Sequence, residues 1–147
     1  MRKRVDHKVP FLDLRITSLD EKKAILSCME RVLDHGWVIL GPEVSEFEKK
    51  FANYCGTKHA LGTGSGTDAL SLAGRALGLS LEDEIIVPAL SWIASAHAFK
   101  MTGAEVVFAD IRNDLTIDPV SVERLITPKT KAILAVHFMG RICDMEE

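Results

Sequence analysis

Residues 60–79 read ALGTGSGTDALSLAGRALGL, in which three glycines and two threonines fall within positions 62–67 and a helical apolar pattern follows. We interpret this segment as a strand, a tight loop and a helix. The first N–H groups of a helix have no internal partners and carry partial positive charge. Glycine lets a backbone approach an anion closely and adopt unusual φ values. The segment therefore predicts a phosphate site formed by the backbone of Gly66 and Thr67 and by a hydroxyl group.

The elements around this turn alternate in type. Helical patterns cover residues 18–36, 41–56, 66–80, 91–103 and 118–126, and short strand patterns cover 59–62, 84–88, 105–110 and 131–138. The last three strands are almost continuous apolar runs, which is typical of strands covered on both faces by helices. From about residue 58 onward, this order predicts an α/β fold with a mostly parallel sheet.

Several local signals set the expected helix ends and faces. Ser18 or Asp20 is expected to cap the first helix and Asp118 the last, while glycines at 36 and 56 end the first two helices. We expect a buried stripe at Val44, Phe47 and Phe51, and an apolar face at Leu70, Ala73 and Leu77. Gly74 lies inside a helix, where it costs about 1 kcal/mol relative to alanine, so we expect close packing there.

Composition excludes several classes of protein. The 147 residues are 47% hydrophobic and 27% charged, and the formal net charge is −3, which gives no electrostatic indication of nucleic-acid binding. The basic MRKR terminus is read as a solvated end, and no window resembles a signal peptide or a membrane span. Cys28, Cys55 and Cys143 and the five histidines lack metal-ligand spacing, and the cysteines form no disulfide framework. We therefore expect a cytoplasmic protein with reduced thiols and no metal.

Three phosphate ligands and a ligand-free glycine turn are the alternatives for residues 62–67. A nucleoside-triphosphate loop needs a lysine after its last glycine, but Thr67, Asp68 and Ala69 follow here. A dinucleotide turn needs G-x-G-x-x-G and an acid at the end of the next strand, which instead ends in Pro88 and Ala89. Pyridoxal phosphate remains. Trp92 follows that strand, and an indole face suits its electron-poor ring, although core packing is the alternative for a single tryptophan.

Longer motifs add a resemblance. GWVILGPEVSEFEKKFANYCGTKHALGTGSGTDALSLAGRALGL, then DEIIVPALSWIASAHAFKMTGAEVVFADI, then TIDPVSVERLITPKTKAILAVHFMGRICDM resemble the DegT/DnrJ/StrS family of sugar aminotransferases, nearly throughout the chain. The resemblance implies the fold of aspartate aminotransferase (fold type I), a homodimer and pyridoxal 5′-phosphate as cofactor. It also implies transfer of an amino group from glutamate to a keto sugar carried on a nucleotide, in making polysaccharide or glycosylated metabolites.

The resemblance also implies roles for individual residues. Gly66 and Thr67 would hold the cofactor phosphate, and Trp92 would stack on the pyridine ring. His137, at the end of the fourth strand, would lie on the same side of the sheet, with a structural role as its alternative. GWVILGP resembles the family's loop near the dimer interface and substrate entrance. The expected domain is residues 1–147 of an incomplete large domain, with helices and entrance loop at 1–57 and the start of the sheet at 58–147.

Other implied parts have no counterpart before Glu147. The family's Schiff-base lysine and the aspartate that contacts the pyridine nitrogen lie farther along its chain, so no catalytic residue is assigned here. Lys58 and Lys131 open strands and Lys100 lies late in a helix, so none fits the lysine's place. We therefore expect this chain to be an amino-terminal fragment that is inactive alone, whether truncated, split or cropped.

Two further readings are compatible with parts of the sequence. A non-catalytic remnant or interaction module of the same fold would keep the dimer surface without the chemistry. A nicotinamide enzyme acting on nucleotide sugars would bind NAD at GTGSGT, which the glycine spacing opposes.

Overall fold

The computed structural model describes residues 11–147; the MRKR segment and His7 lie outside the described residues. The chain forms two compact units that divide between Gly62 and Thr63.

Two helices make up the regular structure of the first unit. Helix α1 spans Leu19–His35, and Ser18 caps it by accepting a hydrogen bond from the N–H of Glu21. Helix α2 spans Pro42–Cys55. Gly36 and Gly56 follow the two helices with φ near +68°, the left-handed conformation that glycine adopts without steric cost. The predicted ends of both helices are confirmed.

The predicted buried stripe of α2 is wrong for the described chain. The side chains of Phe47 and Phe51 stack with ring centroids 5.6 Å apart, yet the two residues stay 56% and 47% exposed. Helix α1 has no buried residue. The apolar spacing of both helices was read correctly, but spacing identifies a face that can be buried without showing what covers it.

The predicted strand at residues 59–62 is also absent. The backbone N–H of Gly62 donates to Glu48 Oε1 at 2.8 Å, so a side chain occupies the donor that a strand ladder would use. Within residues 11–147 this segment pairs with no strand. A strand exists only with a neighbour, which a run of four residues cannot reveal.

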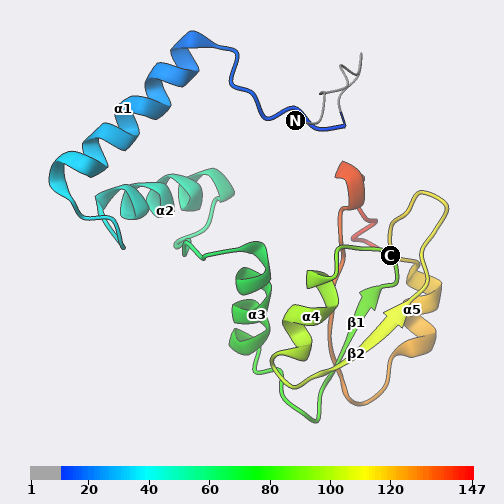
Figure 1. Cartoon of the computed structure of the whole chain (residues 1–147). Helices are drawn as coiled ribbons and strands as arrows, with labels where there is room; N and C mark the ends of the chain where they lie inside the picture. Colours follow the sequence, from blue (N-terminus) through cyan, green and yellow to red (C-terminus); the bar gives the residue numbers. More distant parts are fainter. Residues whose placement is uncertain (1–10) are drawn as a thin grey trace, which may run out of the picture. The chain divides into compact units, whose positions relative to one another are not determined.

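The second unit contains a parallel three-stranded sheet and the helices that connect its strands. After α3, Gly66–Ala76, come β1, Glu84–Pro88, and α4, Ala94–Lys100. They are followed by β2, Glu105–Ala109, α5, Pro119–Leu125, β3, Thr130–Ile133, and a 3-10 turn, η1, at Phe138–Gly140. The strand order is β2-β1-β3, and both pairings are parallel. Figure 1 shows α3 and α4 side by side on one face of the sheet and α5 on the other. The predicted fold class is confirmed.

Alternate residues of β1 divide the core between the two faces of the sheet. Ile85 and Val87 pack with Leu79, Phe99 and Ala104. Ile86 faces the opposite side, where its cluster contains four other buried residues: Ala109, Ile117, Val122 and Cys143. The apolar run of β1 is therefore that of a strand covered on both sides.

The ends of β3, α3 and α4 differ most from their predicted positions. Strand β3 ends at Ile133 rather than 138, because Leu134 N–H makes a last bond to Ile86 O at 2.8 Å and Pro88 has no N–H to continue the ladder. Helix α3 ends at Ala76, just before the left-handed Gly78, and α4 begins at Ala94 instead of Ser91.

The buried face of α3 also differs from the predicted one. Ser71 and Gly74 are the buried residues of this helix, whereas Ala73 and Leu77 are exposed. A Cβ atom at Gly74 would lie 3.0 Å from Phe99 Cδ1 and 3.1 Å from Thr102 Cγ2. The predicted close packing at Gly74 is confirmed, because α3 approaches α4 through a position without a side chain.

Candidate functional site

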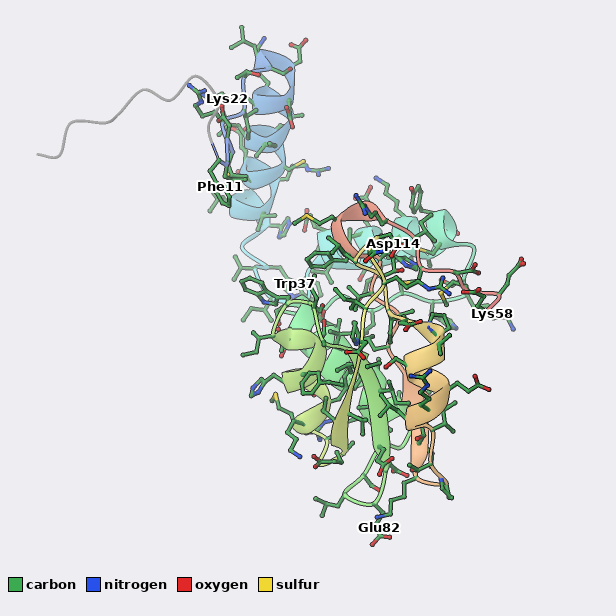
Figure 2. The ribbon with its side chains drawn as sticks, turned by 90° about the vertical axis from the view of Figure 1, so that its right-hand side faces the viewer. Phe11, Lys22, Trp37, Lys58, Glu82 and Asp114 are labelled. Carbon is green, nitrogen blue, oxygen red and sulfur yellow. The ribbon has the colours of Figure 1, made fainter. Side chains whose placement is uncertain are left out.

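The glycine turn and the start of α4 lie at the edge of the sheet where the strands end. Helix α3 leads through residues 77–83 to the first residue of β1, so its amino terminus lies at the other end, beside the carboxyl ends of the strands. Helix α4 follows β1 directly and begins at that same edge. Figure 2 shows Asp114, which follows β2, and Glu82, which precedes β1, at opposite ends of the sheet unit.

Strand order marks a particular place along this edge. The chain passes from β1 to β2 on one side and then crosses to β3 on the other, with α4 and α5 on opposite faces. In open parallel sheets, ligands bind where the strand order reverses in this way. Here that point lies between the ends of β1 and β3. Trp92 follows β1 and His137 follows β3, so the fold places both at this part of the edge.

The glycine turn presents backbone donors. Ser65 caps α3: its Oγ accepts from the N–H of Asp68 at 3.1 Å and donates to Asp68 Oδ2 at 2.9 Å. Within residues 11–147, the N–H groups of Gly66 and Thr67 and the hydroxyl of Thr67 make no hydrogen bond. Gly66 is exposed, and a Cβ there would meet no atom within 4 Å, so the first residue of the helix is not covered by other protein atoms. These groups form an accessible anion cradle at a helix terminus.

The glycines in this turn are not used for unusual dihedral angles, contrary to expectation. None of Gly62, Gly64 and Gly66 has a positive φ. At Gly64 a Cβ would lie 3.2 Å from Asp68 Oδ2, so the missing side chain leaves room for the capping carboxylate. The turn therefore depends on a bare backbone more than on glycine's conformational freedom.

Trp92 combines a fixed backbone with an uncovered ring. Its carbonyl accepts from Ser95 N–H at 2.9 Å, and the hydroxyls of Ser91 and Ser95 lie 2.7 Å apart. The residue is nevertheless 77% exposed. In this chain the core-packing alternative for Trp92 is therefore wrong. Its stacking on a cofactor ring stays a prediction.

His137 has a structural contact. Its Nδ1 accepts the backbone N–H of Cys143 at 3.1 Å, and the Cys143 thiol donates to the carbonyl of Val136 at 3.2 Å. Because Nδ1 accepts this hydrogen bond, it carries no proton in the contact. The ring thus holds the segment after η1 against the end of β3. A role for His137 at the cofactor stays a prediction.

Sequence reasoning missed two features of this edge. The first is Ser65, although S-x-x-D before a helical run is close to a capping signature. The second is the loop between β2 and α5, where Asp114 Oδ1 accepts from the N–H and hydroxyl of Thr116. These two bonds hold the pKa of Asp114 below its usual range. Arg141 donates to the carbonyl of Asp114 at 3.0 Å, which joins the loop to the segment after β3.

The lysines of the second unit lie at the other edge of the sheet. They are Lys100, Lys129 and Lys131. Lys100 ends α4 and pairs with Glu105 at the start of β2, at 2.5 Å. Lys131 lies 3.7 Å from Asp83, which precedes β1, and the carbonyl of Lys129 accepts from the N–H of Glu84.

No helix in the described part of the chain is long and apolar enough to cross a membrane. Across residues 11–147, no three histidine, cysteine or acidic side chains gather as a metal site would require.

Comparison with known protein families identifies the family of this chain. Residues 19–147 match the model of the DegT/DnrJ/EryC1/StrS aminotransferase family. The chain belongs to this family. The resemblance found in the sequence is therefore confirmed, and the fold is that of the fold type I aminotransferases.

Individual relatives agree with this assignment. The chain is 49% identical over 140 residues to dTDP-3-amino-3,6-dideoxy-alpha-D-galactopyranose transaminase of Aneurinibacillus thermoaerophilus, covering 94% of this chain and 38% of that protein. The crystal structure of DesV from S. venezuelae matches with a TM-score of 0.89 and 47% identity, covering 94% and 38%. Spr1654 from Streptococcus pneumoniae, in its PLP form, matches with a TM-score of 0.85 and 34% identity, covering 94% and 34%. The chain thus spans little more than a third of the length of these relatives.

Proposed function

We propose that this chain forms the cofactor-phosphate end of an aminotransferase that uses pyridoxal 5′-phosphate and acts on nucleotide-linked keto sugars, with glutamate as amino donor. Family membership supports the reaction class, and the relative with 49% identity is named as a dTDP-sugar transaminase. The observation that carries the proposal is the pair of N–H groups at Gly66 and Thr67, which bond to no protein atom within residues 11–147 and lie at the carboxyl edge of the sheet. We place the complete enzyme in the cytoplasm as a homodimer, in polysaccharide or glycosylated-metabolite synthesis.

The residues present fit a phosphate group. Two N–H groups at a helix terminus and a free hydroxyl are donors, and a phosphate ester offers only acceptors at neutral pH. The carboxylate of Asp68 is nearby in sequence and carries the same negative charge as a phosphate. Its Oδ2 already accepts a hydrogen bond from the hydroxyl of Ser65. The Ser65–Asp68 pair thus satisfies the third N–H of the turn and leaves the first two for an anion.

Each residue has a distinct role in this proposal. Gly66 and Thr67 bind the phosphate and fix one end of the cofactor. Trp92 supplies an exposed indole face against the ring, and His137 borders the site at the end of β3. When bound, the cofactor supplies an electron-withdrawing ring that stabilises negative charge at the reacting carbon. The protein's contribution at this edge is to orient that ring and to exclude water from one of its faces.

We also infer that these 147 residues alone do not transaminate. Transamination requires a lysine amine at the cofactor aldehyde. The three lysines of the second unit lie at the opposite edge, and two of them face Asp83 and Glu105. The alternative function, an interaction module of the same fold, requires no cofactor at all. Cofactor binding therefore distinguishes the two readings.

Substitution of Gly66 tests the phosphate site. Gly66 is the first residue of α3 and Ser65 is extended, so proline fits there without breaking the helix. Gly66→Pro deletes one donor N–H, whereas the matched control Gly66→Ala retains it. Loss of one charge-assisted hydrogen bond predicts about ten- to hundredfold weaker binding of pyridoxal phosphate to the proline variant. Binding of pyridoxal, which lacks the phosphate, should differ little between them.

Quenching of tryptophan fluorescence by added pyridoxal phosphate measures this binding, and it also reports on Trp92. The chain has two tryptophans, so Trp92→Phe should abolish most of the quenching and Trp37→Phe should preserve it. Equal affinity of the proline and alanine variants would reject the phosphate assignment. Borohydride treatment with pyridoxal phosphate, followed by peptide mapping, should modify no single lysine stoichiometrically. One uniquely modified lysine would contradict the inferred inactivity.

A further inference from the structure

His35 connects the end of α1 to the start of α2 through two different ring nitrogens. Its Nδ1 accepts the backbone N–H of Trp37 at 3.0 Å, and its Nε2 lies 3.2 Å from Glu43 Oε1. Because an amide N–H can only donate, Nδ1 carries no proton in this arrangement. The proton of the neutral ring is then on Nε2, which donates to Glu43. Both contacts are made only by this neutral tautomer.

The loop that His35 holds has an unusual backbone. Residues 37–40 read WVIL, and all four are more than 60% exposed. Leu40 has a φ of +51°, and a Cβ at Gly41 would lie 2.5 Å from the carbonyl oxygen of Trp37. The loop therefore folds tightly back on itself, and the amide of Trp37 at its start is fixed by His35. The turn between the helices, with Trp37 labelled, can be followed in Figure 2.

The charged groups around His35 come from both helices. Glu43 and Glu46 lie on α2, and Arg31 lies one turn before His35 on α1. A hydrogen bond from its own backbone N–H and, next, the contact with His35 hold the pKa of Glu43 below its usual range. Glu43 is therefore ionised at neutral pH. Glu46 pairs with Lys50 at 2.6 Å, which leaves Glu43 as the carboxylate bonded to the imidazole.

We propose that His35 is a proton-sensitive latch for the exposed loop at residues 37–40. On protonation, Nδ1 gains a hydrogen that points at the N–H of Trp37, and two donors then face each other at 3.0 Å. The Nε2 contact becomes an ion pair with Glu43, so the ring stays with α2. The loop then loses the hydrogen bond from Trp37 N–H to His35 Nδ1, and this N–H group turns to solvent. Histidine is the side chain that ordinarily makes this change between pH 5 and 8.

Fluorescence of Trp37 across pH 5–8, in the full chain carrying Trp92→Phe, tests the latch. Trp37 is then the one remaining tryptophan of the two in the sequence, and the proposal requires its signal to follow the single proton that binds His35 Nδ1. His35→Gln keeps an amide that can accept and donate but does not titrate, so its signal should be flat. Glu43→Gln removes the ion pair that favours the charged ring, so its transition should move to lower pH. Circular dichroism shows whether each variant keeps its helices.

Exchange of the Trp37 amide with water, measured by NMR and corrected for its intrinsic pH dependence, is the second readout. Loss of one hydrogen bond predicts about fivefold less protection at the acidic end of the range. His59→Gln, His97→Gln and His137→Gln are the matched controls and should leave both readouts unchanged. A Trp37 signal that is constant between pH 5 and 8 in the Trp92→Phe chain would overturn the proposal. So would a transition that persists in His35→Gln.

Discussion

Adding one methyl group at Gly74 sets two effects of known size against each other. Helix propensity alone predicts that Gly74→Ala stabilises the chain by about 1 kcal/mol. In the structure, however, the new Cβ would lie 3.0 Å from Phe99 and 3.1 Å from Thr102. Phe99 is 3% exposed, and the Thr102 hydroxyl donates to the Phe99 carbonyl at 2.7 Å, so neither neighbour can move freely.

Overpacking of this kind costs about 1–3 kcal/mol, which exceeds the gain in propensity. We therefore expect Gly74→Ala to lower the free energy of unfolding by about 1 kcal/mol, as measured by urea denaturation followed by circular dichroism. Gly66→Ala is the matched control, since its Cβ meets no atom within 4 Å and should not destabilise. Phe99→Leu should reduce the penalty of Gly74→Ala in a double-mutant cycle. The reasoning fails if Gly74→Ala raises stability by the amount that propensity predicts.

Two further predictions concern the loops at the ends of the strands. Ser65→Ala removes the cap of α3 and should cost about 1 kcal/mol in the same urea assay, while Ser65→Thr should restore most of it. Asp114 has a lowered pKa, so its bonds to Thr116 stabilise the fold above the unfolded-state pKa, near 4, and that contribution is lost as pH falls through the folded-state value. In Asp114→Asn the amide oxygen can still accept both hydrogen bonds, so the free energy of unfolding should fall less between pH 5 and pH 2 than in the wild type. An equal fall in both proteins would contradict this.

Much of the second unit was predictable because its signals are local. Asp118 and Pro119 fix the start of α5. The apolar run at 84–88 identifies a strand that is covered on both faces. The alternation of strand and helix patterns after residue 66 then leads to a parallel sheet. The glycine turn before α3 belongs to the same category, because a glycine-rich helix start can be recognised in the sequence, while its binding of phosphate stays a prediction.

The incorrect predictions concern contacts between distant segments. Whether residues 59–62 form a strand depends on a neighbouring strand, and the carboxylate of Glu48 binds their last N–H instead. The side of α3 that faces α4 is set by the bare position at Gly74, which an apolar pattern does not weigh. The bond from Cys143 to His137 joins residues on either side of a 3-10 turn, and no periodicity reports it. Such pairings require coordinates.

Pro88 is the last residue of β1, and its position sets where the hydrogen bonding between β1 and β3 ends. The backbone N–H groups of Glu84 and Ile86 point toward β3. Every second residue of a strand faces the same neighbour, so residue 88 would be the next donor, but proline has no N–H. After Leu134 the β1–β3 pairing ends, and the chain continues from β1 to Trp92 and from β3 to His137. Because proline has no N–H, the covalent structure of a single residue sets where the pairing of β1 with β3 stops, and no conformational change is needed to stop it there.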